Sequence, residues 1–307
     1  MFLEDKKALL ICIGGSILTY NLLRVAKSLY DSSRRSSEWV PVGVVKSLYV
    51  FPVKSCRRRE LVDREFAFVD GSTGIRFTAR LAPSLVLVEV DVSDRVLTFR
   101  LPTGQEMSVQ LDAVISRYDV KRATFGRDLK VDGLDCGDEI SKFISDFTGT
   151  PDVRLLMFRP ELYNGRPCIT FEDLSPYHIS TEPSLQALNE RLSEKIISEQ
   201  FRANIIVDKC LPWDEDRWSE MKIGDVELAC YKPCTRCVLI TVHSETGVKS
   251  SDLQPLKALR EFRLAPTGKM REAHGDAPMF GLNAGLIHPG YIHVGQTVYA
   301  RYKPTPF

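Results

Sequence analysis

Clustered and alternating apolar positions predict a β-rich body that begins near Val42. The run 42–50 is mostly apolar and β-branched, which is typical of a buried strand. Residues 65–69 and 75–78 flank a glycine-containing segment, so they predict a hairpin. Residues 85–90 and 96–99 form a second candidate pair of strands. We expect this first unit to be a β-barrel or a sandwich that ends near residue 150.

Helical spacing of apolar residues appears in three places further along the chain. Residues 140–147 carry an apolar residue every three or four positions, and Gly149 follows as an expected helix end. Thr181 is a typical N-cap for a helix with leucines on one face, and residues 255–262 predict a third, weaker helix.

Strands are expected again in the last third of the chain, over residues 224–231, 237–242 and 291–299, with a turn at Gly295. The pattern as a whole predicts a β-rich α+β fold, with two β-rich units and a few helices packed against them.

The N-terminus differs from this body. Residues 8–23 are apolar and uncharged, with Lys6 and Lys7 before them and a heavier set of basic residues after them. This pattern predicts a short membrane anchor that leaves the body on the cytosolic side and suits the mitochondrial outer membrane. A cleaved secretory signal and a buried helix are the alternatives. The predicted organisation is an anchor and tether over 1–41, a first domain over 42–150 and a second over 151–307.

Composition narrows the class of protein. The 307 residues include 41 basic and 40 acidic side chains, so net charge does not favour nucleic acid as a partner. The eight cysteines are scattered through a large chain, which is unlike a disulfide scaffold and favours reduced thiols.

The segment Lys232-Pro-Cys-Thr-Arg-Cys237 carries the candidate chemistry. A zinc site needs about four ligands, but there is no second C-x-x-C motif and His243 is the only imidazole nearby. A thioredoxin-like pair is expected before a helix, whereas a strand-like run follows here. One cysteine could instead bind a metal that arrives with an organic cofactor. Spacing alone favours a fourth alternative, two half-buried core thiols.

Other polar residues are weaker signals. Lys54 and Ser55 follow a predicted strand and suit a phosphate oxygen, although a lysine at the end of a strand is usually only solvated. The alternative for Arg64 is a surface ion pair with Asp63 or Glu65. Arg202 and Asn204 alternate beside a core run, so we expect both on one face of a strand, where they could recognise an anion.

Several segments together, in their order along the chain, resemble the MOSC-domain family. The resemblance extends from about residue 44 to 299, and it rests on these segments: Tyr49-Val-Phe-Pro-Val-Lys-Ser-Cys56, Asp63-Arg64, Thr78-Ala-Arg80, Phe201-Arg-Ala-Asn-Ile205, Lys232-Pro-Cys-Thr-Arg-Cys237 and Phe280-Gly-Leu-Asn283. Within this family, the sequence most resembles the members that reduce amidoximes.

The resemblance implies a molybdenum cofactor, in which a pterin dithiolene holds the metal and the pterin carries a phosphate. It implies that Cys237 ligates the metal and is the catalytic residue. The residues that it implies for cofactor binding are Lys54, Ser55, Arg64, Ser175, Arg202, Asn204, Thr235, Arg236 and Asn283. Two positions depart from the family pattern: Leu174 stands where relatives often have a hydroxyl, and Asn283 where vertebrate members have a tyrosine.

The resemblance further implies an oxidoreductase that reduces N-hydroxylated compounds, including amidoximes, hydroxylamines and N-hydroxylated bases. NADH-cytochrome b5 reductase and cytochrome b5 would supply its electrons. The chain has no Gly-rich dinucleotide fingerprint, haem motif or iron–sulfur cysteine set, which fits an external electron carrier. A carrier of sulfur or of the cofactor, and a binding module without reductase activity, are the alternatives.

Overall fold

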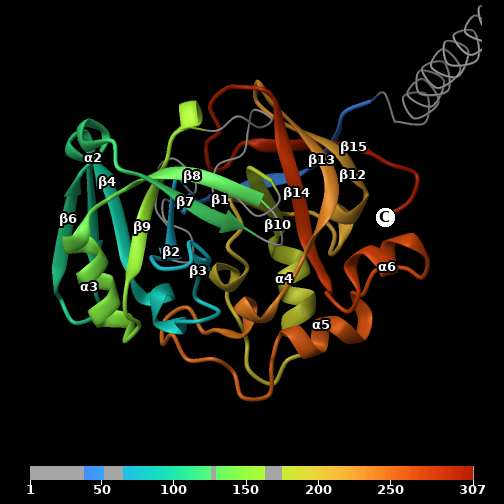
Figure 1. The fold of residues 1–307 in the computed structure, drawn as a ribbon. Coiled ribbons are helices and arrows are strands. Elements are labelled where there is room, and N and C mark those ends of the chain that lie inside the picture. The colour runs from blue at the N-terminus through green and yellow to red at the C-terminus, as the bar shows by residue number, and fades with distance from the viewer. Residues whose placement is uncertain (1–37, 52–64, 126–128, 163–174, 307) are drawn as a thin grey trace, which may run out of the picture.

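A closed barrel of seven strands forms one half of the body (Figure 1). The computed structural model describes residues 38–51, 65–125, 129–162 and 175–306. In barrel order the strands are β1 (Val40–Leu48), β11 (Ile205–Asp208), β10 (Tyr177–Thr181), β14 (Met279–His288), β13 (Val226–Thr235), β12 (Trp218–Ile223) and β15 (Thr297–Tyr302). Neighbours are antiparallel except β10 and β11. All seven strands contribute buried apolar residues to one core, which includes Trp218 and Met221.

The other half, at the left of Figure 1, contains two open sheets. The larger has the order β3 (Arg76–Phe77), β2 (Phe66–Asp70), β9 (Val153–Phe158), β8 (Leu129–Asp135) and β7 (Val120–Phe125). The smaller is β4 (Glu89–Ser93), β5 (Val96–Arg100) and β6 (Glu106–Gln110), followed by helix α2 (Leu111–Arg117). Phe66, Phe68 and Phe99 lie in the core between these elements.

The three predicted helices are confirmed, and the local signals that predicted them are present. They are α3 (Asp138–Thr148), α4 (Glu182–Asn189) and α5 (Leu256–Phe262). Gly149 ends α3 in the left-handed conformation with φ 66°. The Thr181 hydroxyl accepts the backbone N–H of Ser184 at 3.3 Å and so caps α4. The short helix α6 (Lys269–His274) was not predicted.

Both predicted hairpins form, but two strand boundaries differ. β2 pairs with β3, and β4 pairs with β5. The prediction of a strand over 85–90 is wrong in its first half, because Pro83 begins the 3-10 helix η1 (Pro83–Leu87) and β4 starts only at Glu89. The strand predicted over 291–299 begins only at Thr297, since Gly295 has φ 89° and donates its N–H to the Val45 carbonyl in a loop.

Strand pairing crosses the predicted boundary at residue 150. β1 pairs with β11 and β15 and so belongs to the barrel of the second unit. β9 lies after residue 150 but pairs with β2 and β8 of the first unit. The first unit was expected to be a barrel or a sandwich. Among the described residues it shows no closed barrel: its strands form two open sheets that share one core, and β1 helps to close the other barrel instead.

The predicted anchor over residues 8–23 lies outside the described part of the chain. Within the described part, no helix has the length and apolar character needed to cross a membrane.

Candidate functional site

The two cysteines of the C-T-R-C segment lie at the end of β13, beside the start of β14. Thr235 is the last residue of β13 and pairs with Met279. The next residue, Arg236, donates its backbone N–H to the Pro278 carbonyl at 2.7 Å. The predicted strand over 237–242 is wrong: Cys237 precedes the 3-10 helix η5 (Val238–Thr241). Ile240 of η5 instead packs in a buried cluster with Leu188 of α4 and Leu259 of α5.

The Arg236 guanidinium ties this segment to two other parts of the barrel. Its Nη2 donates to the Phe201 carbonyl at 2.8 Å, and its Nη1 donates to Cys234 Sγ at 3.0 Å. Nη1 also lies 3.4 Å from His178 Nε2. The third donor, Nε, is buried and has no hydrogen-bond acceptor among the described residues. Such an orphaned donor calls for an acceptor beyond the described residues.

Cys234 and Cys237 differ in their surroundings although both are partly buried. Burial raises the pKa of the Cys234 thiol, but the charges of His178 and Arg236 and their hydrogen bonds to the sulfur outweigh it and lower the pKa to about 6. Cys234 is therefore largely a thiolate at neutral pH. The same strand carries Cys230, where burial raises the thiol pKa to about 12.

His178 is a site residue that the sequence did not single out. It lies in β10, is 4% exposed, and its Nε2 is 3.3 Å from the Phe280 carbonyl. Gly281 makes room for this ring: it has φ 74°, and an added Cβ would lie 2.6 Å from His178 Nε2 and 2.3 Å from the Ile179 carbonyl. In the sequence, only the Phe-Gly-Leu-Asn motif pointed to this part of the site. The close approach of Gly281 to His178 explains the glycine in that motif.

Arg202 does not lie on a strand, so the expectation that Arg202 and Asn204 share a strand face is wrong. Arg202 ends the 3-10 helix η3 (Ser198–Phe201) in the left-handed conformation with φ 54°, and Asn204 precedes β11. The guanidinium carbon of Arg202 is 4.1 Å from the centre of the Phe51 ring. The side chain is thus placed by a turn and by an aromatic face.

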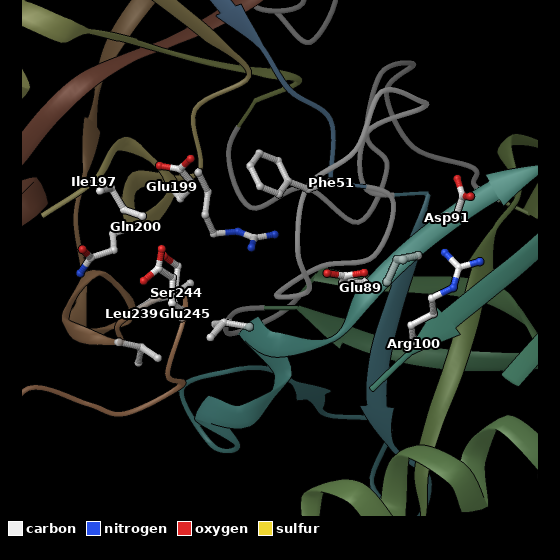
Figure 2. Close-up of a pocket in the computed structure, with 14 residues that line it drawn as sticks. Phe51, Glu89, Asp91, Arg100, Ile197, Glu199, Gln200, Leu239, Ser244 and Glu245 are labelled. Carbon is white, nitrogen blue, oxygen red and sulfur yellow. The ribbon is translucent and has the colours of Figure 1, made fainter. Parts of the chain in front are cut away.

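Arg202 also lines a cavity of about 420 Å³ between the two halves of the body. Figure 2 shows that Glu199 and Glu245 lie on the barrel side of this cavity, whereas Glu89 lies on the side of β4 and β5. Leu239 of η5 belongs to the lining as well. The cavity therefore adjoins the turn that carries Cys237.

Three of the predicted cofactor residues are engaged with backbone groups. The Asn204 amide accepts the His178 N–H at 2.9 Å and donates to the Tyr49 carbonyl at 3.2 Å. The Ser175 hydroxyl donates to the Tyr177 carbonyl at 2.7 Å, and the Asn283 amide donates to the Pro233 carbonyl at 3.2 Å. These side chains hold the strand ends around Arg202 and the C-T-R-C segment in place.

Arg76 of β3 brings a charge from the first unit toward Cys237. Burial, and then the charge of Arg80, lower the pKa of Arg76, while Cys237 raises it. This proximity was missed by reasoning from residue patterns, although the Thr78-Ala-Arg80 segment lies beside it. Lys54, Ser55 and Arg64 lie outside the described residues, so their predicted contacts stay predictions.

The described residues fit a molybdenum cofactor. Cys237 offers a partly buried thiol, and a thiolate is a soft ligand that suits a redox metal with a sulfur-rich cofactor. Beside it, Arg236 holds a buried donor without an acceptor, and Arg202 adds a second guanidinium at the cavity. Planar guanidinium groups match phosphate oxygens and pterin acceptor atoms.

Comparisons with known proteins agree with this chemistry. Residues 42–151 match the family described as MOSC N-terminal beta barrel domain, and residues 167–299 match the MOSC domain. Mitochondrial amidoxime-reducing component 1 of Homo sapiens is 33% identical over 293 residues, which cover 87% of this chain and 86% of that protein. Mitochondrial amidoxime reducing component 2 of Homo sapiens has the same identity and coverage. Component 1 of Mus musculus is 30% identical over 291 residues, with 87% and 84% covered.

Proposed function

This chain belongs to the MOSC-domain family that includes the mitochondrial amidoxime-reducing components, and we propose that it is a molybdenum cofactor-dependent reductase of N-hydroxylated compounds. The observation that carries the proposal is the partly buried Cys237 thiol, which precedes η5 and directly follows Arg236, whose buried Nε donor lacks an acceptor among the described residues. A thiol beside a cationic donor suits a metal that arrives with an anionic cofactor.

Each residue has a separate task in this proposal. Cys237 would ligate the metal, and Arg202 and Arg236 would bind the anionic part of the cofactor. When bound, the cofactor would supply the two-electron redox chemistry that splits the N–O bond of the substrate. Ser175 and Asn204 would act indirectly, because their hydrogen bonds to backbone groups fix the strand ends around the site.

We further propose that the electrons come from NADH through cytochrome b5 reductase and cytochrome b5, and that the protein works at the mitochondrial outer membrane. The relatives' names include the word mitochondrial, which supports a mitochondrial location. An anchor over residues 8–23 would raise the effective concentration of donor proteins held in the same membrane. The amidoxime group in the relatives' names supports the proposed substrate class.

The test is a metal analysis followed by a turnover assay. Protein purified from cells that make the cofactor should hold about one molybdenum per chain and should reduce benzamidoxime when NADH and the two cytochrome components are added. Cys237→Ala should lose this activity while its circular dichroism spectrum stays unchanged. Cys230→Ala is the matched control, because it removes a thiol from β13, the strand that ends just before Cys237, but leaves the C-T-R-C segment intact.

Two outcomes would contradict the proposal. If Cys237→Ala reduced benzamidoxime as fast as the wild type, Cys237 would not be the metal ligand of a reductase. If the wild type held no molybdenum, or held it without any turnover, the protein would be a binding module or carrier. A persulfide on a cysteine, detected by mass spectrometry, would then identify a sulfur carrier.

A further inference from the structure

The proposed function uses one cysteine of the C-T-R-C segment and leaves the other without a role. Cys234 Sγ accepts a hydrogen bond from Nη1 of Arg236, and the charge of His178 of β10 acts on the same sulfur and lowers its pKa. Among the described residues, these two side chains are the charged or titratable groups that act on Cys234. The sulfur therefore accepts a guanidinium donor and lies close to an imidazole, which is an unusual surrounding for a thiol that only fills space.

The geometry of Arg236 depends on this sulfur. A guanidinium is planar, so anchoring both terminal nitrogens fixes its orientation and leaves Nε pointing in one direction. Nη2 is anchored by the Phe201 carbonyl at 2.8 Å and Nη1 by the Cys234 sulfur at 3.0 Å. The second distance is short for a bond to sulfur, as expected for a charge-assisted hydrogen bond between a guanidinium and a thiolate.

The same guanidinium links the two turns that carry candidate cofactor residues. Phe201 directly precedes Arg202, and its ring stacks on Phe280 with the ring centres 3.9 Å apart. Arg236 directly precedes Cys237 and donates its backbone N–H to Pro278. Removing the anchor at Cys234 would free one end of the side chain that connects these turns.

We propose that Cys234 is a positioning residue: it anchors the Arg236 guanidinium, and thereby sets the relative placement of Cys237 and Arg202 before the cofactor binds. The effect on cofactor binding rests on the proposed function. The anchoring of Arg236 by Cys234 does not, because it involves only residues of the protein. A site whose supporting residues are fixed beforehand binds its metal more tightly than one that must be ordered on binding.

Three substitutions separate an ionic anchor from simple packing. Cys234→Ala removes the acceptor, Cys234→Ser keeps a small neutral acceptor, and Cys234→Asp restores an anion opposite Arg236. We expect the alanine and serine variants to lose molybdenum per chain by about tenfold, the usual effect of removing a residue that supports a metal ligand. The aspartate variant should recover at least half of the wild-type content, whereas packing alone would favour serine.

A second measurement does not need the cofactor. Thiolates absorb in the far ultraviolet, so titration of the cofactor-free wild type against Cys234→Ser should show one thiolate step near pH 6 that belongs to Cys234. Cys230→Ala, the matched control on β13, should keep this step and the wild-type molybdenum content. Circular dichroism and urea unfolding of every variant identify those that fold, and the serine and aspartate variants allow the comparison even if the alanine variant does not fold.

The proposal is overturned if Cys234→Ser binds molybdenum as well as the wild type does, if Cys234→Asp is no better than Cys234→Ala, or if the thiolate step is missing. Failure of the proposed function would look different. In that case the wild type would hold no molybdenum, while the titration would still show whether Cys234 is the thiolate that anchors Arg236.

Discussion

Replacing Glu215 with glutamine should stabilise the protein at alkaline pH and flatten its pH dependence. Glu215 lies in the 3-10 helix η4 (Asp214–Arg217) and is fully buried. Its carboxylate accepts hydrogen bonds from the Thr181 hydroxyl at 3.1 Å and the Ser184 hydroxyl at 2.9 Å. Burial, and then the charge of Asp216, raise the pKa of Glu215 from 4.5 to about 7, against the opposing effects of the Ser184 hydrogen bond and Arg263.

The sign and size of the effect follow from proton linkage. Between pH 4.5 and about 7 the folded protein keeps a proton on Glu215 that the unfolded chain has already released. Folding therefore becomes less favourable as pH rises through this window. The stabilisation is fully present below the unfolded pKa and is lost once pH exceeds the folded pKa. A shift from 4.5 to about 7 corresponds to about 3 kcal/mol of unfolding free energy.

Urea unfolding at a series of pH values measures this effect. Trp213 and Trp218 flank η4, so tryptophan fluorescence reports on the region concerned. At about pH 5 Glu215→Gln should be close to the wild type, and at about pH 8 it should be more stable by up to about 3 kcal/mol. The exposed Glu190→Gln is the control and should show no such pH dependence. If the difference between Glu215→Gln and the wild type were the same at both pH values, Glu215 would ionise normally in the folded state and the reasoning would be refuted.

Three further predictions concern the site and its supports. Arg202→Ala should mainly lower the molybdenum content per chain, measured by mass spectrometry, and an unchanged content would assign Arg202 a structural role only. Arg263→Met should lower the unfolding free energy by about 3–5 kcal/mol in urea, since it leaves the buried Asp216 carboxylate without its partner at 2.7 Å. Arg122→Met, which breaks an exposed ion pair, should change it far less, because solvent screens that pair. Gly281→Ala should lower the melting temperature and the molybdenum content together, because the new Cβ would displace His178.

The features that were predicted correctly depend on neighbours in the sequence. The helix α4 was predicted from Thr181 and the leucine spacing, and the cap bond is formed within the same four residues. The end of α3 was predicted from Gly149, whose positive φ is a local requirement. The N-cap and the terminal glycine act through residues only a few positions apart, so the helix ends that they specify do not depend on tertiary packing.

The features that were missed depend on partners far away along the chain. The run 238–242 has strong β propensity but forms η5, in which Ile240 packs in a buried cluster with Leu188 of α4 and Leu259 of α5. β14 was not predicted as a strand, since its two glycines and irregular pattern give no alternation. His178 gained its role only from contacts with Arg236, 58 residues away. No local pattern carries this information.

The support of the C-T-R-C segment extends beyond the residues that touch it. Arg263 donates its Nε to the Met279 carbonyl at 3.1 Å and both of its terminal nitrogens to Asp216. Met279 pairs with Thr235, and the preceding carbonyl, that of Pro278, accepts the Arg236 N–H. The buried ion pair therefore holds the start of β14, and β14 holds the segment that presents Cys237. A buried ion pair is weak evidence for stability, because apolar residues could often replace it at no loss. The position of the Arg263–Asp216 pair at the start of β14 instead favours a role in fixing the shape of the site. That role requires arginine at position 263, because only its planar guanidinium can bind Asp216 with two nitrogens and the Met279 carbonyl with the third.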